Sequence, residues 1–244
     1  MSEQMYRVAL ASRPTGAPTA KNFSYEPAEI PTPGEGEVLV RVHYMSLDPY
    51  MRGRMDDGPS YAAPVPVGGT MEAGAVGEVI ASNSPAFKPG DFAFGMFGWA
   101  THGCLPATQL RKVDPNQAPI TTSLGVLGMP GFTGWYGLTE LGKPKAGETL
   151  VVAAATGPVG SMVGQVAKLA GLRTVGVAGG ADKCTLAVEK FGFEVHEVTA
   201  LFLINLVINI FFAPVFGRAV GRFGERNALA FEYVGLVIVF PLVP

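Results

Sequence analysis

The chain has 244 residues, which is enough for one large domain or two ordinary ones with a buried core. Charged residues make up 16% of it and the net charge is −2, so the composition indicates neither a nucleic-acid partner nor an anionic membrane surface. The two cysteines, Cys104 and Cys184, exclude a disulfide framework and lack the spacing of metal ligands. Because the N-terminal segment also has no apolar core of signal-peptide length, we expect a reduced, cytoplasmic compartment.

Residues 1–125 have the pattern of short strands separated by turns. We expect strands at Tyr6–Ala11, Glu37–Tyr44, Val67–Ser82 and Asp91–Gly98, and the last two are bounded by Gly, Pro or Asn. Short strands at this spacing predict a β-rich domain that forms a partly open barrel or a sandwich.

From residue 126 the pattern changes to helices that alternate with buried strands. The first helix is expected over Met129–Leu141. After it we expect a strand at Thr149–Ala155, a helix at Ser161–Ala170, a strand at Arg173–Ala178, a helix at Ala181–Phe191 ended by Gly192, and a third strand starting at Glu194–Val198. This βαβαβ order over residues 126–199 predicts an α/β fold with a parallel sheet and right-handed crossovers.

A glycine-rich turn joins the first of these buried strands to its helix. We expect Gly157 to permit the tight turn, Gly160 to leave room for a pyrophosphate, and Gly164 to let the helix pack closely on the strand. Free amides and the helix dipole would attract an anion there. The first glycine of the usual dinucleotide pattern is replaced by Ala155, so a turn that only packs is the alternative. The expected cofactor-binding residues are Thr156, Gly157, Pro158, Val159 and Gly160.

The end of the next strand bears on which dinucleotide is bound. An NAD site places Asp or Glu about 20 residues after the glycine turn, and here the strand ends in small residues that include Gly179. Lys183 follows and can neutralise a 2′-phosphate, which favours NADPH. Asp182 keeps NAD open, and Lys183 can also be read as an ordinary surface lysine in the first turn of a helix.

Five stretches of the chain resemble a known family. They are ALASRPTGAP, SLDPYMRGRM, LGVLGMPGFTGWYGL, KAGETLVVAAATGPVGSMVGQVAKLAG and VGVAGGADKC, in family order between about Val8 and Phe193. They are similar to the zinc-free branch of the medium-chain dehydrogenase/reductase superfamily, which contains curcumin reductases and prostaglandin/alkenal double-bond reductases. The resemblance implies a GroES-like β domain at residues 1–125 and an NADP-binding Rossmann domain at residues 126–199.

The resemblance also implies a reaction, in which NADPH reduces the carbon–carbon double bond of an α,β-unsaturated ketone or aldehyde. Hydride reaches the β-carbon and a proton reaches the α-carbon, while the charge on the carbonyl oxygen is stabilised. Zinc-binding members carry Cys, His and Glu ligands where this chain has Ser46–Pro49, and its three histidines are scattered, so we expect no metal. A phenol would then serve as the hydrogen-bond donor.

Tyr61 and Tyr50 match tyrosines of the curcumin reductase pattern. We favour Tyr61 as the donor and Tyr50 as a wall of the pocket; the alternative is that one of them only packs in its loop. Arg52 and Arg54 are expected to orient the loop or approach the cofactor, unless they are solvated surface residues. By the same resemblance, three further residues should lie near the nicotinamide and its phosphates: Met129, Gly131 and Thr133.

The family pattern stops near residue 200, although members of the family continue the sheet with further strands. We therefore expect a truncated Rossmann sheet, with the family's usual dimer doubtful. Residues 200–244 are two apolar stretches around an arginine-rich connection, Gly217–Arg226, which resembles a loop motif of major facilitator transporters. The tail reads as a hydrophobic helical hairpin of foreign origin that contacts a membrane, or as one that covers the broken sheet. An inactive or membrane-tethered dinucleotide-binding fusion fragment is the alternative function.

Overall fold

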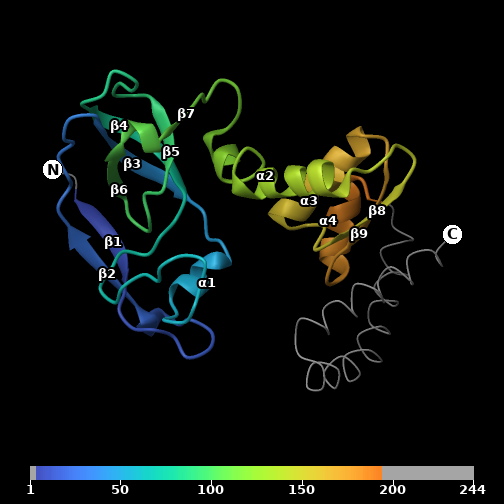
Figure 1. Ribbon diagram of the computed structural model, residues 1–244, viewed down its shortest axis with the longest axis horizontal. Coiled ribbons are helices and arrows are strands. Elements are labelled where there is room, and N and C mark those ends of the chain that lie inside the picture. Colours follow the sequence, from blue (N-terminus) through green and yellow to red (C-terminus); the bar gives the residue numbers. More distant parts are fainter. Residues whose placement is uncertain (1–3, 194–244) are drawn as a thin grey trace. The chain divides into compact units, whose positions relative to one another are not determined.

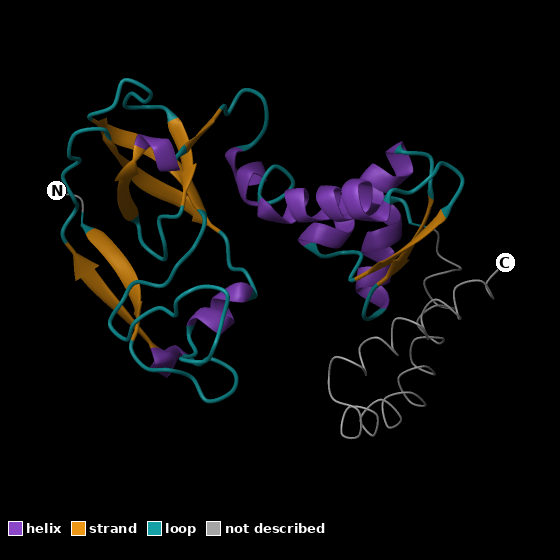
Figure 2. Cartoon of the chain, viewed as in Figure 1, coloured by secondary structure: helices purple, strands orange, loops and turns teal. Residues whose placement is uncertain are grey.

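The computed structural model describes residues 4–193, which form two compact units divided between Thr133 and Gly134. The first unit holds most of the strands, and helices dominate the second (Figures 1 and 2). The expected third parallel strand at Glu194–Val198 and the hydrophobic tail at residues 200–244 lie outside the described residues. Within residues 4–193, no helix is both long enough and apolar enough to cross a membrane.

The first unit is built from two antiparallel sheets. A ribbon pairs β1 (Met5–Leu10) with β2 (Phe23–Ala28), and two isolated bridges connect β1 to Thr70 and Ala100. The larger sheet has the strand order β6-β3-β4-β5-β7. Its strands are β3 (Glu37–Met45), β4 (Ala75–Ser82), β5 (Phe92–Gly95), β6 (His102–Pro106) and β7 (Arg111–Val113).

Alternating apolar residues of the larger sheet form one core of this unit. Val38 and Val40 of β3 meet Val79 of β4, with Phe87 and Phe97 beside them. A second core lies under α1 (Tyr50–Arg54) and includes Leu10, Met51, Met55 and Met71. Short 3₁₀ turns complete the unit: η1 (Ala20–Asn22), η2 (Ala107–Gln109) and η3 (Ile120–Leu124).

The expected strand at Val67–Ser82 is too long, because β4 begins only at Ala75. Gly68 has a φ of 85° and the amide of Gly69 bonds to the carbonyl of Pro66, so the chain turns here. Strand β5 is likewise shorter than the expected Asp91–Gly98.

The second unit is a parallel strand pair covered by helices. The helix α2 (Met129–Tyr136) crosses the division between the units and continues as the π-helical turn η4 (Gly137–Gly142). Strand β8 (Thr149–Ala153) pairs in parallel with β9 (Arg173–Val177), so that Ala153 lies opposite Val177. The crossover helix is α3 (Pro158–Leu169), and α4 (Ala181–Phe191) follows β9.

Two local features of this unit agree with the sequence. The apolar run at residues 149–155 contains β8, a strand of a parallel pair as expected, although Val152 is its only buried residue. Gly192 ends α4 in the left-handed conformation with a φ of 69°, as its position after the last helical turn predicts. Phe193 then turns back into the core beside Val152, Ala155 and Ala187.

Candidate functional site

The glycine-rich turn lies where β8 passes into α3. Gly157 is the N-cap residue and makes no side-chain capping bond, and Pro158 occupies the first helical position. Because the first amides of a helix have no acceptor within it, Val159 and Gly160 present donors at this end. The positive end of the helix dipole adds to their attraction for an anion.

Packing within the protein gives a reason for Gly160 that the sequence did not indicate. A β-carbon at Gly160 would collide with the carbonyl group of Ala154 and would also crowd Ala155. The glycine therefore lets the helix begin directly against the end of the strand. At Gly157 an added β-carbon would meet the same Ala154 oxygen at 3.2 Å, which is a tight contact but not a collision.

The expectation for Gly164 also needs correction. A β-carbon at Gly164 would collide with the ring of Phe193, and one at Gly176 of β9 would lie 2.9 Å from the same ring. The two glycines thus make space for a phenylalanine that packs between α3 and β9. Phe193 is only 2% exposed.

A backbone feature of this turn was not foreseen from the sequence. Ala154 has a φ of 50°, a left-handed conformation that costs an alanine about 1–2 kcal/mol. Its carbonyl accepts a hydrogen bond from the Gly157 amide, which closes the turn. Strain at the point where a strand gives way to a binding turn is a feature of functional sites.

The residues expected to recognise the adenosine ribose follow the neighbouring strand. Because β8 and β9 are parallel, the turn after β8 and the segment after β9 lie at the same edge of the sheet, and the Ala155 amide bonds to the Val177 carbonyl at 3.0 Å. A β-carbon at Gly179 would meet nothing within 4 Å. Lys183 is exposed in the first turn of α4, with the exposed Asp182 beside it. This edge can therefore accept an anionic group.

Tyr50 and Tyr61 come together around one arginine in the first unit. The Arg54 Cζ atom lies 5.7 Å from the ring centroid of Tyr50 and 4.5 Å from that of Tyr61. Tyr50 begins α1 and packs partly against the second core, whereas the Tyr61 side chain is 84% exposed. Either phenol can donate a hydrogen bond to a developing oxyanion.

Burial raises the pKa of the Tyr50 phenol above its ordinary value of 10.0. The carboxylates of Asp48 and Glu72, and the neighbouring Tyr61, add to the increase, and the Arg54 guanidinium opposes it. The phenol of Tyr50 therefore keeps its proton at neutral pH, as a hydrogen-bond donor must.

The two arginines expected near this loop hold it in place. Arg52 donates to the carbonyl of Gly16 at 2.9 Å and forms an ion pair with Asp56 at 2.7 Å. Arg54 is buried and pairs with Glu72 at 3.3 Å. The sequence did not indicate Glu72 as a member of the group, because it lies 18 positions beyond Arg54 in a segment that we expected to be part of a strand and that precedes β4 in the structure.

The three residues expected near the nicotinamide lie on α2. The hydroxyl of Thr133 donates to the carbonyl of Met129 at 2.7 Å, and Met129 is half exposed. A β-carbon at Gly131 would collide with the carbonyl of Val126, so this glycine serves the tight turn before the helix. All three belong to the first unit, with the tyrosines.

No group of three or more His, Cys, Asp or Glu side chains within residues 4–193 is arranged to hold a metal ion. Cys104 lies 3.7 Å from the Glu37 carboxylate in the first unit, and burial, with help from that carboxylate, raises the pKa of its thiol to about 11. Cys184 lies in α4, and both cysteines are free thiols.

Comparison with known proteins gives consistent results. Residues 6–113 match the family model described as the N-terminal domain of oxidoreductase. NADPH-dependent curcumin reductase from Escherichia coli is 55% identical over 189 residues, which are 78% of this chain and 55% of that protein. Prostaglandin reductase 1 from Rattus norvegicus is 38% identical over 74% of this chain and 53% of its own length.

The fold is shared with solved structures. The crystal structure of CurA in complex with NADPH from Vibrio vulnificus superposes with a TM-score of 0.73 at 48% identity, covering 78% of this chain and 56% of that one. The chain thus spans a little over half the length of the relatives it matches. Over the part that it shares with them, the chain belongs to the medium-chain dehydrogenase/reductase superfamily.

Proposed function

We propose that the chain binds NADPH and reduces the carbon–carbon double bond of α,β-unsaturated ketones and aldehydes. The observation that carries the cofactor assignment is the position of the α3 N-terminus at the same sheet edge as the end of β9. Its backbone amides have no acceptor within the helix, and the segment after β9 carries an exposed lysine. The relatives named for NADPH-dependent curcumin reduction and for prostaglandin and alkenal reduction support the same chemistry.

The turn residues fit a dinucleotide. Val159 and Gly160 would donate to the pyrophosphate, and the missing side chain at Gly157 would let a phosphate approach the backbone. Lys183 would neutralise the 2′-phosphate near Gly179. Met129, Gly131 and Thr133 are assigned by resemblance to the nicotinamide end.

When bound, NADPH supplies the hydride that is transferred to the substrate β-carbon. Negative charge then develops on the carbonyl oxygen of the substrate, and the α-carbon takes up a proton from water. The Tyr61 hydroxyl is our choice for the donor that stabilises this oxygen, and Tyr50 forms the wall beside it. A neutral phenol meets the need without a metal, because a hydrogen bond to an enolate oxygen strengthens as its charge grows.

The experiment uses the full chain with NADPH and a simple α,β-unsaturated ketone, and follows the loss of NADPH absorbance. Oxidation that depends on the ketone is expected. Binding of NADPH without oxidation would instead identify a dinucleotide-binding module, and absence of binding would contradict the proposal altogether. A protein that stays in solution only with detergent would indicate that residues 200–244 contact a membrane.

Tyr61→Phe tests the donor. Removing one hydrogen bond to a developing oxyanion costs on the order of 10²-fold in kcat, while the affinity for NADPH should stay unchanged. Tyr50→Phe is the matched variant. An unchanged kcat for Tyr61→Phe would remove this residue from the mechanism.

The free thiols Cys104 and Cys184 suit a reducing, cytoplasmic setting, which we propose for the activity.

A further inference from the structure

Arg54 is a buried cation at the base of the exposed segment that carries Tyr61. Arg54 is 5% exposed, and its Nε atom pairs with the Glu72 carboxylate at 3.3 Å. Its Nη1 atom lies 3.4 Å from the Ser60 hydroxyl and 3.2 Å from the Ala62 carbonyl, which flank Tyr61 on both sides. A guanidinium suits this task because its donors are fixed in one plane, so that it can bond several acceptors and stack on a ring at the same time.

The same guanidinium lies against the tyrosine ring itself. The Tyr61 side chain is 84% exposed, and the residues around it, 56–63, are also exposed. Such a segment has little apolar burial to hold it in one conformation. A cation 4.5 Å from the ring centroid is close enough for a cation–π contact.

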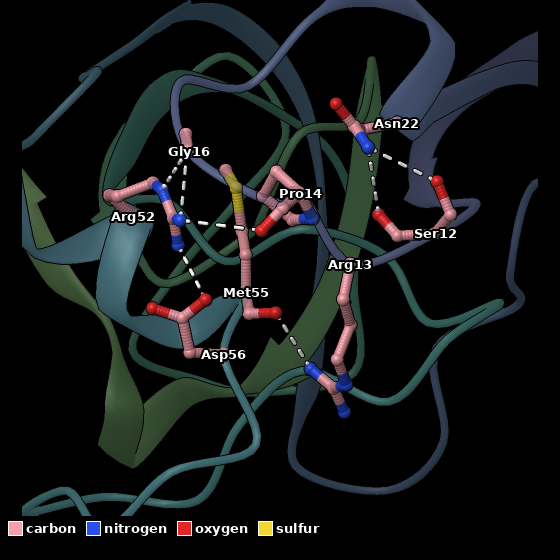
Figure 3. A network of polar contacts seen from close by, with 8 residues as sticks. All are labelled: Ser12, Arg13, Pro14, Gly16, Asn22, Arg52, Met55 and Asp56. Atoms are coloured by element: carbon pink, nitrogen blue, oxygen red, sulfur yellow. Dashed lines mark hydrogen bonds and ion pairs between the residues drawn. The ribbon is translucent and has the colours of Figure 1, made fainter.

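The helix that carries Arg54, α1, is held to the N-terminal loop by hydrogen bonds. Figure 3 shows Arg52 reaching from α1 to the carbonyls of Gly16 and Pro14 and to Asp56, at 2.9, 3.4 and 2.7 Å. In the opposite direction, Arg13 donates to the Met55 carbonyl at 2.9 Å. We call these reciprocal contacts the arginine clasp.

We propose that Arg54 is a positioning residue for the reductase reaction, which fixes the Tyr61 phenol in place before substrate arrives. This inference rests on the proposed function for its chemical meaning. The clasp holds α1 against the N-terminal loop, α1 holds the guanidinium, and the guanidinium holds the tyrosine and its two neighbours. A donor that is already in place loses less entropy when it meets the developing oxyanion.

The test compares Arg54→Lys and Arg54→Gln with the matched control Arg7→Gln. Arg7 lies on β1 in the same unit, pairs with Glu26 at 2.6 Å and donates to Thr70 at 3.2 Å, so the control also loses an ion pair and a hydrogen bond. Native full-length protein is digested with chymotrypsin, and cleavage after Tyr61 is timed. We expect both Arg54 variants to be cut about tenfold faster than the parent, because the lost contacts are worth on the order of 1.4 kcal/mol. The control should match the parent.

Steady-state kinetics separate positioning from simple stabilisation. With NADPH and the ketone, the Arg54 variants should lose kcat while the KM for NADPH stays unchanged, and thermal unfolding should show that they remain folded at the assay temperature. The Arg54→Lys variant keeps the positive charge but lacks the planar guanidinium group with its several donors. Full recovery of kcat and of slow cleavage by Arg54→Lys would therefore overturn the positioning role, and so would parental cleavage rates in both variants.

The two proposals fail in different ways. If the parent chain does not oxidise NADPH in the presence of the ketone, the proposed function is wrong, but the cleavage after Tyr61 still decides whether Arg54 fixes this segment. If the parent is active and cleavage is unaffected, the function stands and the inference about Arg54 is wrong. If Arg54→Gln does not fold, Arg54→Lys and Glu72→Gln provide the comparison, since Glu72→Gln keeps the guanidinium and removes its ion-pair partner.

Discussion

A methyl group added at Gly160 would collide with the Ala154 carbonyl, whereas one added at Gly157 would lie 3.2 Å from its nearest neighbour. The two glycines stand three residues apart in one turn, and Gly160 is the one whose β-carbon the packing of the protein excludes. An added β-carbon at Gly157 would be crowded by a single backbone oxygen. A motif that looks uniform in sequence thus combines a structural glycine with one whose function we assign to phosphate binding.

This difference predicts opposite effects for two similar substitutions. Gly160→Ala should lower the free energy of unfolding by about 1–3 kcal/mol, because the backbone of the turn must move. Gly157→Ala should lower stability less, since its φ of −74° suits any residue and the new methyl group would crowd only the Ala154 oxygen, yet it should weaken NADPH binding by about tenfold by crowding the phosphate. Urea unfolding and NADPH fluorescence titration measure the two quantities. Equal losses of stability would contradict the assignment.

Tyr50 gives a prediction about pH. Because the folded chain holds the phenol proton more tightly than the unfolded chain does, this group stabilises the fold below pH 10.0 and that contribution is lost as the pH rises through the raised pKa. Arg54→Gln should raise the pKa of Tyr50 further, since the opposing cation is gone, and Glu72→Gln should lower it. Ultraviolet difference titration detects the phenolate, with Tyr50→Phe to identify its signal. A shift in the same direction for both variants would show that the charges do not act as described.

At the scale of the element, Phe193 joins α3 to β9. Its ring is 2% exposed and fills the space that Gly164 and Gly176 leave open. Phe193→Ala should lower the stability of the second unit by about 3–5 kcal/mol, the range for a buried aromatic replaced by alanine. Phe191, which is only partly buried against the same cluster, is the matched control and should cost less. Denaturant unfolding measures both, and equal costs would mean that the ring does not fill this space in solution.

The sequence predicts elements well where one local signal dominates. The apolar run that contains β8 predicts a strand, and Gly192 after the last turn of α4 predicts the end of that helix. Both predictions are correct because each signal lies within a few residues of the feature that it predicts. The strands β2, β6 and β7 were not predicted. Pro27 interrupts the pattern of β2, Gly103 and Pro106 weaken that of β6, and β7 has three residues, too few to show a period.

The candidate site shows the same limit. Tyr50, Tyr61 and the glycine turn could be selected because each lies in a recognisable motif. The link between Arg54 and Glu72 could not, since it depends on how the segment before β4, which the sequence assigned to the strand itself, folds back on α1. The packing roles of Gly160 and Gly164 could not be predicted from the sequence either, because they depend on which atoms lie opposite each glycine in the folded protein.

At the scale of the whole molecule, the proposed donors lie in the first unit and the proposed phosphate site in the second. NADPH at about 100 times its dissociation constant should stabilise the binding unit by about 2.7 kcal/mol and slow amide exchange there by up to roughly 100-fold. Hydrogen-exchange mass spectrometry should show the largest slowing in peptides from β8 to α4, with a smaller effect in β3 and β4. The variant Gly157→Ala should reduce this slowing. Equal protection in both units would place more of the binding energy in the first unit than we assign to it.

The arginine clasp has a practical meaning for anyone who expresses this protein. The loop that contains Pro14 and Gly16 can be mistaken for a dispensable leader, since residues 15–20 are exposed. Its carbonyls nevertheless accept hydrogen bonds from Arg52 of α1, the helix that also contains Tyr50 and Arg54. A chain shortened past Gly16 would lose the hydrogen bonds that hold α1 while keeping every residue of the catalytic motif, and an affinity tag is safer when a spacer separates it from this loop.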